Sequence, residues 1–143
     1  MRNSRSRSRE FALQGFYEWV VSKNDPAAIA AQLVESEGFS ECDVPYFDRL
    51  WHGMTREYAP LLAALAPFSA RTTDALSPIE KGALVIGAWE LLHEPDVPYR
   101  VAIDEAVELA KSYGGTDGHK FVNGVLDKLA ASARPREASA ARA

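Results

Sequence analysis

The chain has 143 residues, 47% of them hydrophobic and 25% charged, which is typical of one globular domain with a buried core. No apolar run approaches the roughly 18 residues needed to cross a bilayer, and the start lacks an apolar signal segment, so we expect a cytoplasmic protein. The single cysteine, Cys42, excludes an internal disulfide and a thiolate metal cluster, and His52, His93 and His119 lack metal-ligand spacing.

The charge of the chain is unevenly distributed. The net charge is −4, but residues 1–9 contain four arginines and no acid, so the remaining residues carry −8. A basic arm on an acidic body directs a polyanion to one place. The charge alone leaves a second interpretation equally open, in which the arm is only a solubilising, frayed N-terminus.

The first half of the chain predicts helices and no strand, because apolar residues recur at intervals of three and four rather than two. The first helix begins near Ser4 or Ser6 and ends at about Ser22. Asp25-Pro26 predicts the start of a second helix, since it combines an N-cap with proline at the first helical position. That helix ends by Gly38.

The third helix is predicted to begin after Asp43, an N-cap residue. Pro60 must kink this helix or begin another, because proline cannot donate to the helical hydrogen-bond ladder. Ser77-Pro78-Ile79-Glu80 has the residues of a capping box and predicts the start of a central helix. The segment 82–92 is apolar nearly all round, so we expect neighbouring helices to surround it, with glycines allowing close approach.

The end of the chain predicts two more helices and a tail. We expect Gly114-Gly115 to end the first of them in a left-handed conformation, and Thr116 or Asp117 to cap the second. Beyond residue 133 the composition collapses to Ala, Arg, Ser, Glu and Pro, which predicts a disordered tail over 134–143.

The sequence gives little support to an enzyme. Asp104, Glu105 and Glu108 have helical spacing, but they lie on a face that is expected to be solvated, facing Lys111. Acid–base catalysis by carboxylates requires a cleft and divergent pKa values. No phosphate-binding glycine loop or nucleophile motif is present either, so we predict no catalytic residues, no metal and no cofactor.

Binding of RNA is the function that the residues favour. Arg5, Arg7 and Arg9 are spaced by two and would fan around the first turns of a helix, offering guanidinium groups to phosphates. Aromatic side chains beside them could stack on unpaired bases, and the candidates are Tyr17, Tyr113 and Phe121. Each has a plainer alternative as a core or rim residue, as Asp117 does as a helix cap.

Five strings of residues between about 4 and 129 resemble the NusB family of bacterial transcription antitermination factors. The strings are RSRSRE, FYEW, YFDRL, SPIEKGALVIGAWEL and DVPYRVAIDEAVELAKSYGGTDGHKFVNGVLDK. The resemblance implies an all-α bundle of about seven helices in two small helical subdomains, within an RNA-binding domain over 1–133. The tail 134–143 lies outside it.

The resemblance also implies a role without catalysis. Members of the family pair with the small-subunit ribosomal protein NusE, and the pair binds the single-stranded boxA element of nascent RNA. With NusA, NusG and RNA polymerase, this complex keeps transcription of ribosomal RNA operons processive. The implied surfaces are Glu80 toward NusE and, toward RNA, Arg5, Arg7, Arg9, Tyr17, Tyr113, Asp117, His119, Lys120 and Phe121.

Two alternative functions remain open at this stage. RNA cytosine methyltransferases carry a NusB-like helical domain ahead of a catalytic domain, for which this chain has no room and no strand–loop pattern. The other alternative is a helical module that binds proteins only.

Overall fold

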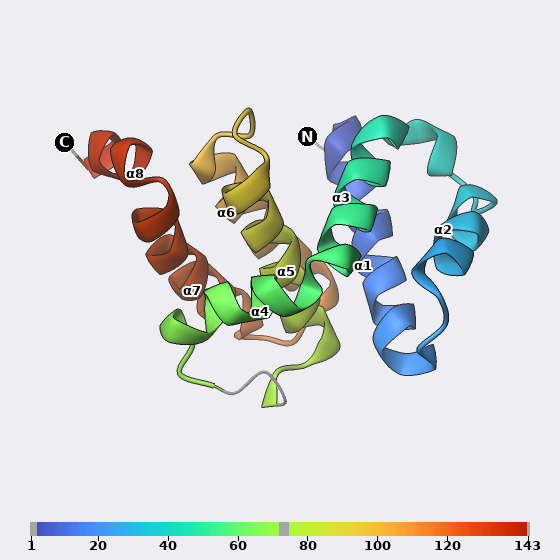
Figure 1. Cartoon of the computed structure of the whole chain (residues 1–143), viewed down its shortest axis with the longest axis horizontal. Helices are drawn as coiled ribbons and strands as arrows, with labels where there is room; N and C mark the ends of the chain where they lie inside the picture. Colours follow the sequence, from blue (N-terminus) through green and yellow to red (C-terminus); the bar gives the residue numbers. More distant parts are fainter. Residues whose placement is uncertain (1–2, 72–74, 143) are drawn as a thin grey trace.

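The computed structural model describes residues 3–71 and 75–142, and within them it contains eight α-helices, two short 3-10 segments and no strand (Figure 1). The all-α fold is confirmed, with eight helices where about seven were predicted. The elements are α1 Ser4–Ser22, α2 Pro26–Val34, η1 Phe39–Glu41, α3 Val44–Arg56, α4 Tyr58–Leu65, η2 Ala66–Phe68, α5 Pro78–His93, α6 Tyr99–Tyr113, α7 Gly118–Ala133 and α8 Pro135–Arg142.

The helices form two groups, which meet where α1 packs against α5. In Figure 1, α1, α2 and α3 lie on one side, α5, α6 and α7 on the other, and α4 crosses below α5. α1 packs against both α3 and α5, so it joins the groups. The core runs through both and includes the fully buried Phe16, Phe47, Trp51, Ile86 and Ile103.

Local capping explains where the main helices begin. The Ser77 hydroxyl accepts a hydrogen bond from the Glu80 N–H, and the Glu80 carboxylate accepts one from the Ser77 N–H, which confirms the predicted capping box. Asp43 also caps α3 as predicted, accepting a hydrogen bond from the Tyr46 N–H. Pro60 lies in the first turn of α4, so it begins a new helix, as one of the two predicted outcomes requires.

The central helix is α5, and neighbouring helices surround it as predicted. Every residue from Gly82 to Leu91 is buried. A Cβ atom added at Gly82 would lie 2.5 Å from Leu13 Cδ1 of α1, and one added at Gly87 would lie 2.6 Å from Leu126 Cδ1 of α7. These two glycines therefore allow the close helix–helix approach that the sequence predicted.

The predicted left-handed exit from α6 is wrong. Gly114 has φ −101° and ψ −170°, an extended conformation, and Gly38 is the glycine with positive φ in the described part of the chain. A Cβ atom at Gly114 would lie 2.6 Å from the Ala110 carbonyl oxygen and 3.3 Å from Ile79 Cγ2. A side chain at this position would therefore clash first with a carbonyl of α6 itself, which favours glycine where that helix ends.

The prediction of a disordered tail is also wrong for the described residues, because residues 135–142 form α8. The preceding residue, Arg134, is 9% exposed and ties this helix to the end of α5. Its guanidinium donates hydrogen bonds to the carbonyl oxygens of Glu90, Leu91 and Glu94 at 2.8–3.0 Å, and to that of Val97. The composition of the tail does not reveal the role of this arginine. Its guanidinium donates hydrogen bonds to carbonyl groups that have no helical partner where α5 ends.

We expect Arg134→Ala to lower the free energy of unfolding by about 2–4 kcal/mol, because it leaves several buried carbonyls without a donor. Urea unfolding followed by circular dichroism measures this loss. The matched control is Arg136→Ala, which truncates an exposed arginine two residues away and should cost less than about 0.5 kcal/mol. Equal stability of the two variants would contradict the role given to Arg134.

No helix among the described residues combines the length and the apolar character needed to span a membrane.

Candidate nucleic-acid interface

The three candidate arginines lie on α1 and point in three different directions. A spacing of two rotates successive side chains by about 200° on a helix, so they fan out as predicted for a helical arm. Arg5 faces α3, where its Nε lies 3.5 Å from Asp43 Oδ2 and its guanidinium carbon lies 4.3 Å from the centre of the Tyr46 ring. Of the three, Arg7 alone lines the groove between α1 and the end of α6.

Arg9 is a structural residue, in contrast to the prediction that it contacts RNA. It is 2% exposed, and its Nε donates a 2.7 Å hydrogen bond to Glu90 Oε2 of α5. Its Nη1 lies 3.1 Å from Glu105 Oε1 of α6, and Tyr46 of α3 donates its hydroxyl proton to Glu90. Four helices meet at this network, so Arg9 is unavailable to a polyanion.

The ionisation of this network follows from its burial. Loss of solvent raises the pKa of Glu90 above its usual range, although Arg9 and Tyr46 act to lower it. Burial acts to lower the pKa of Arg9, but the charge of Glu90 opposes it and the net pKa is raised. Burial and the adjacent Glu90 likewise raise the pKa of Tyr46. Arg9 therefore stays charged, and Tyr46 stays protonated.

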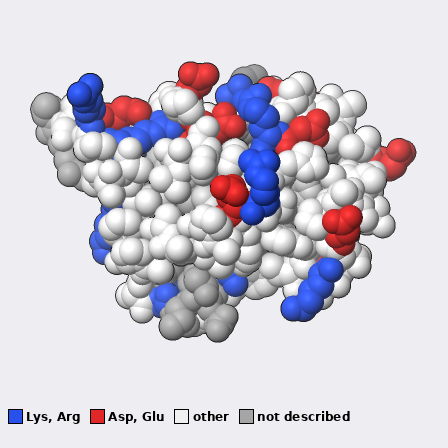
Figure 2. Space-filling view, viewed as in Figure 1, with Lys and Arg blue, Asp and Glu red and all other residues white. Residues whose placement is uncertain are grey.

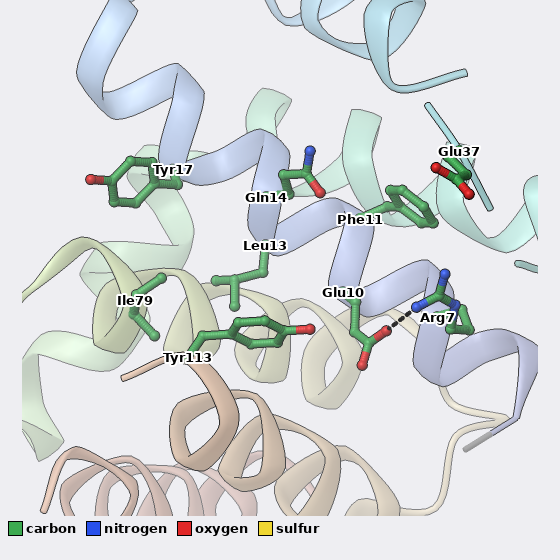
Figure 3. A pocket seen from close by; sticks show the side chains of 9 residues that line it. All are labelled: Arg7, Glu10, Phe11, Leu13, Gln14, Tyr17, Glu37, Ile79 and Tyr113. Atoms are coloured by element: carbon green, nitrogen blue, oxygen red, sulfur yellow. Dashed lines mark hydrogen bonds and ion pairs between the residues drawn. The ribbon is translucent and has the colours of Figure 1, made fainter. Parts of the chain in front are cut away.

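The groove between α1 and the end of α6 brings together residues that the sequence placed nearly 100 positions apart. Figure 3 shows Arg7 with Glu10 at one end and Tyr17 at the other, with the Tyr113 ring pointing toward Glu10. Tyr17 is 49% exposed and Tyr113 is 52% exposed, so both rings are open to solvent. The groove has a volume of about 360 Å³ and is lined by Arg7, Glu10, Phe11, Leu13, Gln14, Tyr17, Glu37, Ile79 and Tyr113.

The charges in this groove favour a base over a phosphate. Arg7 Nη1 lies 3.0 Å from Glu10 Oε1, and Glu37 lines the same groove, so one cation faces two carboxylates. The walls are aromatic and aliphatic, with the Gln14 amide as a neutral donor and acceptor. Exposed rings above an apolar floor suit the face of an unpaired base.

Basic side chains surround the turn between α6 and α7, next to Tyr113. Lys111 and His119 line a second hollow of about 420 Å³ formed around Gly114, Gly115 and Thr116. Lys120 is exposed and lies 3.4 Å from Asp117, the N-cap residue of α7. Asp117 therefore occupies the predicted N-cap position, although its carboxylate makes no capping hydrogen bond.

Phe121 and Glu80 are joined by a residue that the sequence did not suggest. Phe121 is half-buried against the core, and the Arg71 guanidinium carbon lies 4.4 Å from the centre of its ring. Arg71 Nη1 also lies 3.2 Å from Glu80 Oε2. Glu80 itself is 8% exposed, with one oxygen on Arg71 and the other on the Ser77 N–H.

The face of the molecule formed by α3 carries arginines that are already paired with acids. Figure 2 shows Lys and Arg side chains over α3 with Asp and Glu side chains beside them. Arg49 lies 3.3 Å from Glu94, and Arg56 lies 3.8 Å from Glu57. This face therefore has arginine without exposed aromatic partners, in contrast to the groove.

The structure thus assembles part of the predicted site and separates the rest. Arg7, Tyr17 and Tyr113 share one groove, while Arg5 faces α3 and Arg9 is buried. Residues that sequence reasoning missed are Gln14, Lys111 and Arg71. Gln14 could have been found from its i+3 spacing to Tyr17, but Arg71 lies in a segment without a motif.

Comparisons with known proteins identify sequences and structures that are similar to this chain. The profile of the NusB family matches residues 6–131. The transcription antitermination protein NusB of Ralstonia nicotianae is 50% identical over 99% of this chain and 91% of its own length. T. maritima NusB has a TM-score of 0.83 at 26% identity, covering 96% of this chain and 98% of that chain.

A further solved structure holds the antitermination factors NusB and NusE with double-stranded RNA. Its matching chain has a TM-score of 0.83 at 24% identity, covering 92% of this chain and 99% of that chain. At this identity, the similarity shows a shared fold and nothing further. The family profile and the identity over nearly the whole length together settle the classification: the chain belongs to the NusB family.

Proposed function

We propose that this chain is a non-catalytic, RNA-binding antitermination factor that acts in the cytoplasm as one half of a heterodimer with the ribosomal protein NusE. The heterodimer binds single-stranded boxA RNA and joins NusA, NusG and RNA polymerase to keep transcription of ribosomal RNA operons processive. The observation that carries the proposal is the groove in which Arg7, Tyr17 and Tyr113 lie together.

The chemistry of the groove supports single-stranded RNA as its ligand. Sequence-specific recognition of RNA relies on unstacked bases, which stack on aromatic side chains and expose their edges to polar groups. Tyr17 and Tyr113 supply the rings, and Gln14 supplies the polar group. Lys111, His119 and Lys120 surround the turn that follows Tyr113, and in our proposal they contact the backbone phosphates of a strand leaving the groove.

The choice of NusE as partner is supported by family membership and by the solved NusB–NusE complex with RNA. Glu80 remains our candidate for the NusE-facing surface. Since its carboxylate is engaged by Ser77 and Arg71, we propose that Glu80 contributes mainly by fixing the start of α5, with Arg71 as the more exposed member of the pair.

Titration of a labelled boxA-like single-stranded RNA with the chain, with and without NusE, tests the proposal. We expect the heterodimer to bind this RNA at least tenfold more tightly than a scrambled strand, and more tightly than a duplex of the same sequence, because a duplex hides its base faces. Binding to the scrambled strand with equal affinity would contradict the proposal. NusE binding without any RNA binding would instead favour the protein-only module.

A further inference from the structure

Arg71 covers the ring of Phe121 on the surface of the molecule. Its guanidinium carbon lies 4.4 Å from the ring centre, within the range of a cation–π contact, and its side chain is 46% exposed. Phe121 is the ring that the sequence suggested as a platform for a base. A base approaching this ring from solvent therefore meets the Arg71 guanidinium first.

The position of Arg71 is set by a carboxylate that is itself fixed. Glu80 Oε1 accepts the Ser77 N–H at 3.2 Å, and Glu80 Oε2 lies 3.2 Å from Arg71 Nη1. A Cβ atom at Gly118 would lie only 2.9 Å from Glu80 Oε2, so the start of α7 packs against the same carboxylate. Arg71 is thus held by a ring below it and by a buried acid at its edge.

This cluster lies on the first turn of α5, next to a residue that lines the groove. Ile79, which lines the groove beside Tyr113, directly precedes Glu80 in the first turn of α5. Arg71 itself lines a separate hollow of about 330 Å³, so the cluster and the groove are neighbours along the first turn of α5. Among the described residues, Glu80 is the one side-chain acceptor that the Arg71 guanidinium contacts, so other N–H donors remain available.

We propose that Arg71 is a further residue of the RNA interface and that its guanidinium forms the outer layer of a stacking platform on Phe121. An unpaired base stacks on the face of the guanidinium that points away from the ring, and a remaining N–H group donates to the neighbouring phosphate. A planar, weakly hydrated guanidinium can stack and donate at once, whereas an ammonium cannot. The inference rests on the proposed function and deepens it.

The experiment compares Arg71→Ala, Arg71→Lys and Arg100→Ala in the full chain, each with NusE and boxA-like single-stranded RNA over a range of salt. We expect Arg71→Ala to bind about tenfold more weakly, with a log–log salt slope reduced by about one unit. Arg71→Lys keeps the charge but loses the plane, so it should bind about fivefold more weakly with an unchanged slope.

Arg100→Ala is the matched control. Arg100 is 49% exposed, is paired with Asp104 and Asp127, and lies over the Tyr99 ring, but it sits at the far end of α6 from Tyr113. We expect its RNA affinity to equal that of the wild type. Arg71→Lys and Arg100→Ala should keep the wild-type unfolding midpoint. Arg71→Ala removes a partner of the nearly buried Glu80 carboxylate, so it should unfold at a somewhat lower midpoint while staying folded under the conditions of the binding assay.

Two outcomes would overturn the role of Arg71 while the wild type still selects boxA-like RNA. Wild-type affinity in Arg71→Lys would mean that charge alone acts, without stacking. Unchanged or tighter binding by Arg71→Ala would mean that the guanidinium only covers Phe121. If the wild type fails to distinguish boxA-like from scrambled RNA, the proposed function itself is contradicted, and the role of Arg71 falls with it.

Discussion

Replacing Arg9 with methionine is expected to lower the free energy of unfolding by about 3–5 kcal/mol. The change leaves Glu90 as a fully buried carboxylate whose other oxygen, Oε1, already lacks a partner among the described residues. A buried charge without its counter-ion is among the costliest defects in a core, and a whole domain has about 5–15 kcal/mol of stability. Urea unfolding followed by far-ultraviolet circular dichroism measures the loss.

The control for Arg9→Met is the double variant Arg9→Met/Glu90→Met, which removes both charges. It should recover at least half of the lost stability, because an apolar pair of similar volume can replace a buried ion pair at little cost. A second readout separates structure from binding: the folded Arg9→Met protein should keep the wild-type salt slope for RNA, since Arg9 reaches no phosphate. A slope lower by one unit would return Arg9 to the interface.

Replacing Tyr17 and Tyr113 together with alanine should weaken binding of boxA-like RNA by about 2–6 kcal/mol, at least thirtyfold. Each ring lines the groove and is about half exposed, so each can take the face of one base. Stacking is worth about 1–3 kcal/mol per base, and separate bases contribute nearly additively. Fluorescence anisotropy of labelled RNA with the NusE heterodimer gives the affinities.

Two further variants separate the rings from other effects of the substitutions. Tyr17→Phe/Tyr113→Phe keeps both rings and should bind nearly as the wild type does. Val21→Ala truncates a 65% exposed side chain on the same helix, outside the groove, and should also leave binding unchanged. Equal affinities for the alanine pair and the wild type would remove the groove from the interface.

The helices were predictable from the sequence because their signals are local. Asp43 and the box of Ser77 and Glu80 place caps at the starts of α3 and α5, and the apolar run 82–92 identifies the central helix. The helix in the tail was not predicted, because composition describes only the average of a segment. Here a single residue, Arg134, fixes the segment to the rest of the protein. Arg134 reaches four carbonyls some 40 positions earlier in the chain, which no local pattern reveals.

The residue types of the candidate site were predictable, but the directions in which their side chains point were not. The spacing of Arg5, Arg7 and Arg9 shows that they fan around a helix, yet only packing decides which one meets Glu90 in the core. Tyr17 shares an apolar stripe with Leu13, so periodicity alone favoured burial, whereas the groove leaves its ring half exposed. No local pattern predicts the role of Arg71, because its contact with Phe121 depends on how its segment packs against the start of α7.

The central claim is that one RNA strand binds both to Arg7 and to the corner formed by residues 113–121. Photo-crosslinking of a 4-thiouridine-substituted boxA-like RNA to the NusE heterodimer, with the adducts mapped by mass spectrometry, tests it most directly. We predict adducts on Tyr17 and Tyr113, whose rings are open to solvent. Adducts confined to the Arg49–Arg56 face of α3 would contradict the claim, because that face lies away from the groove.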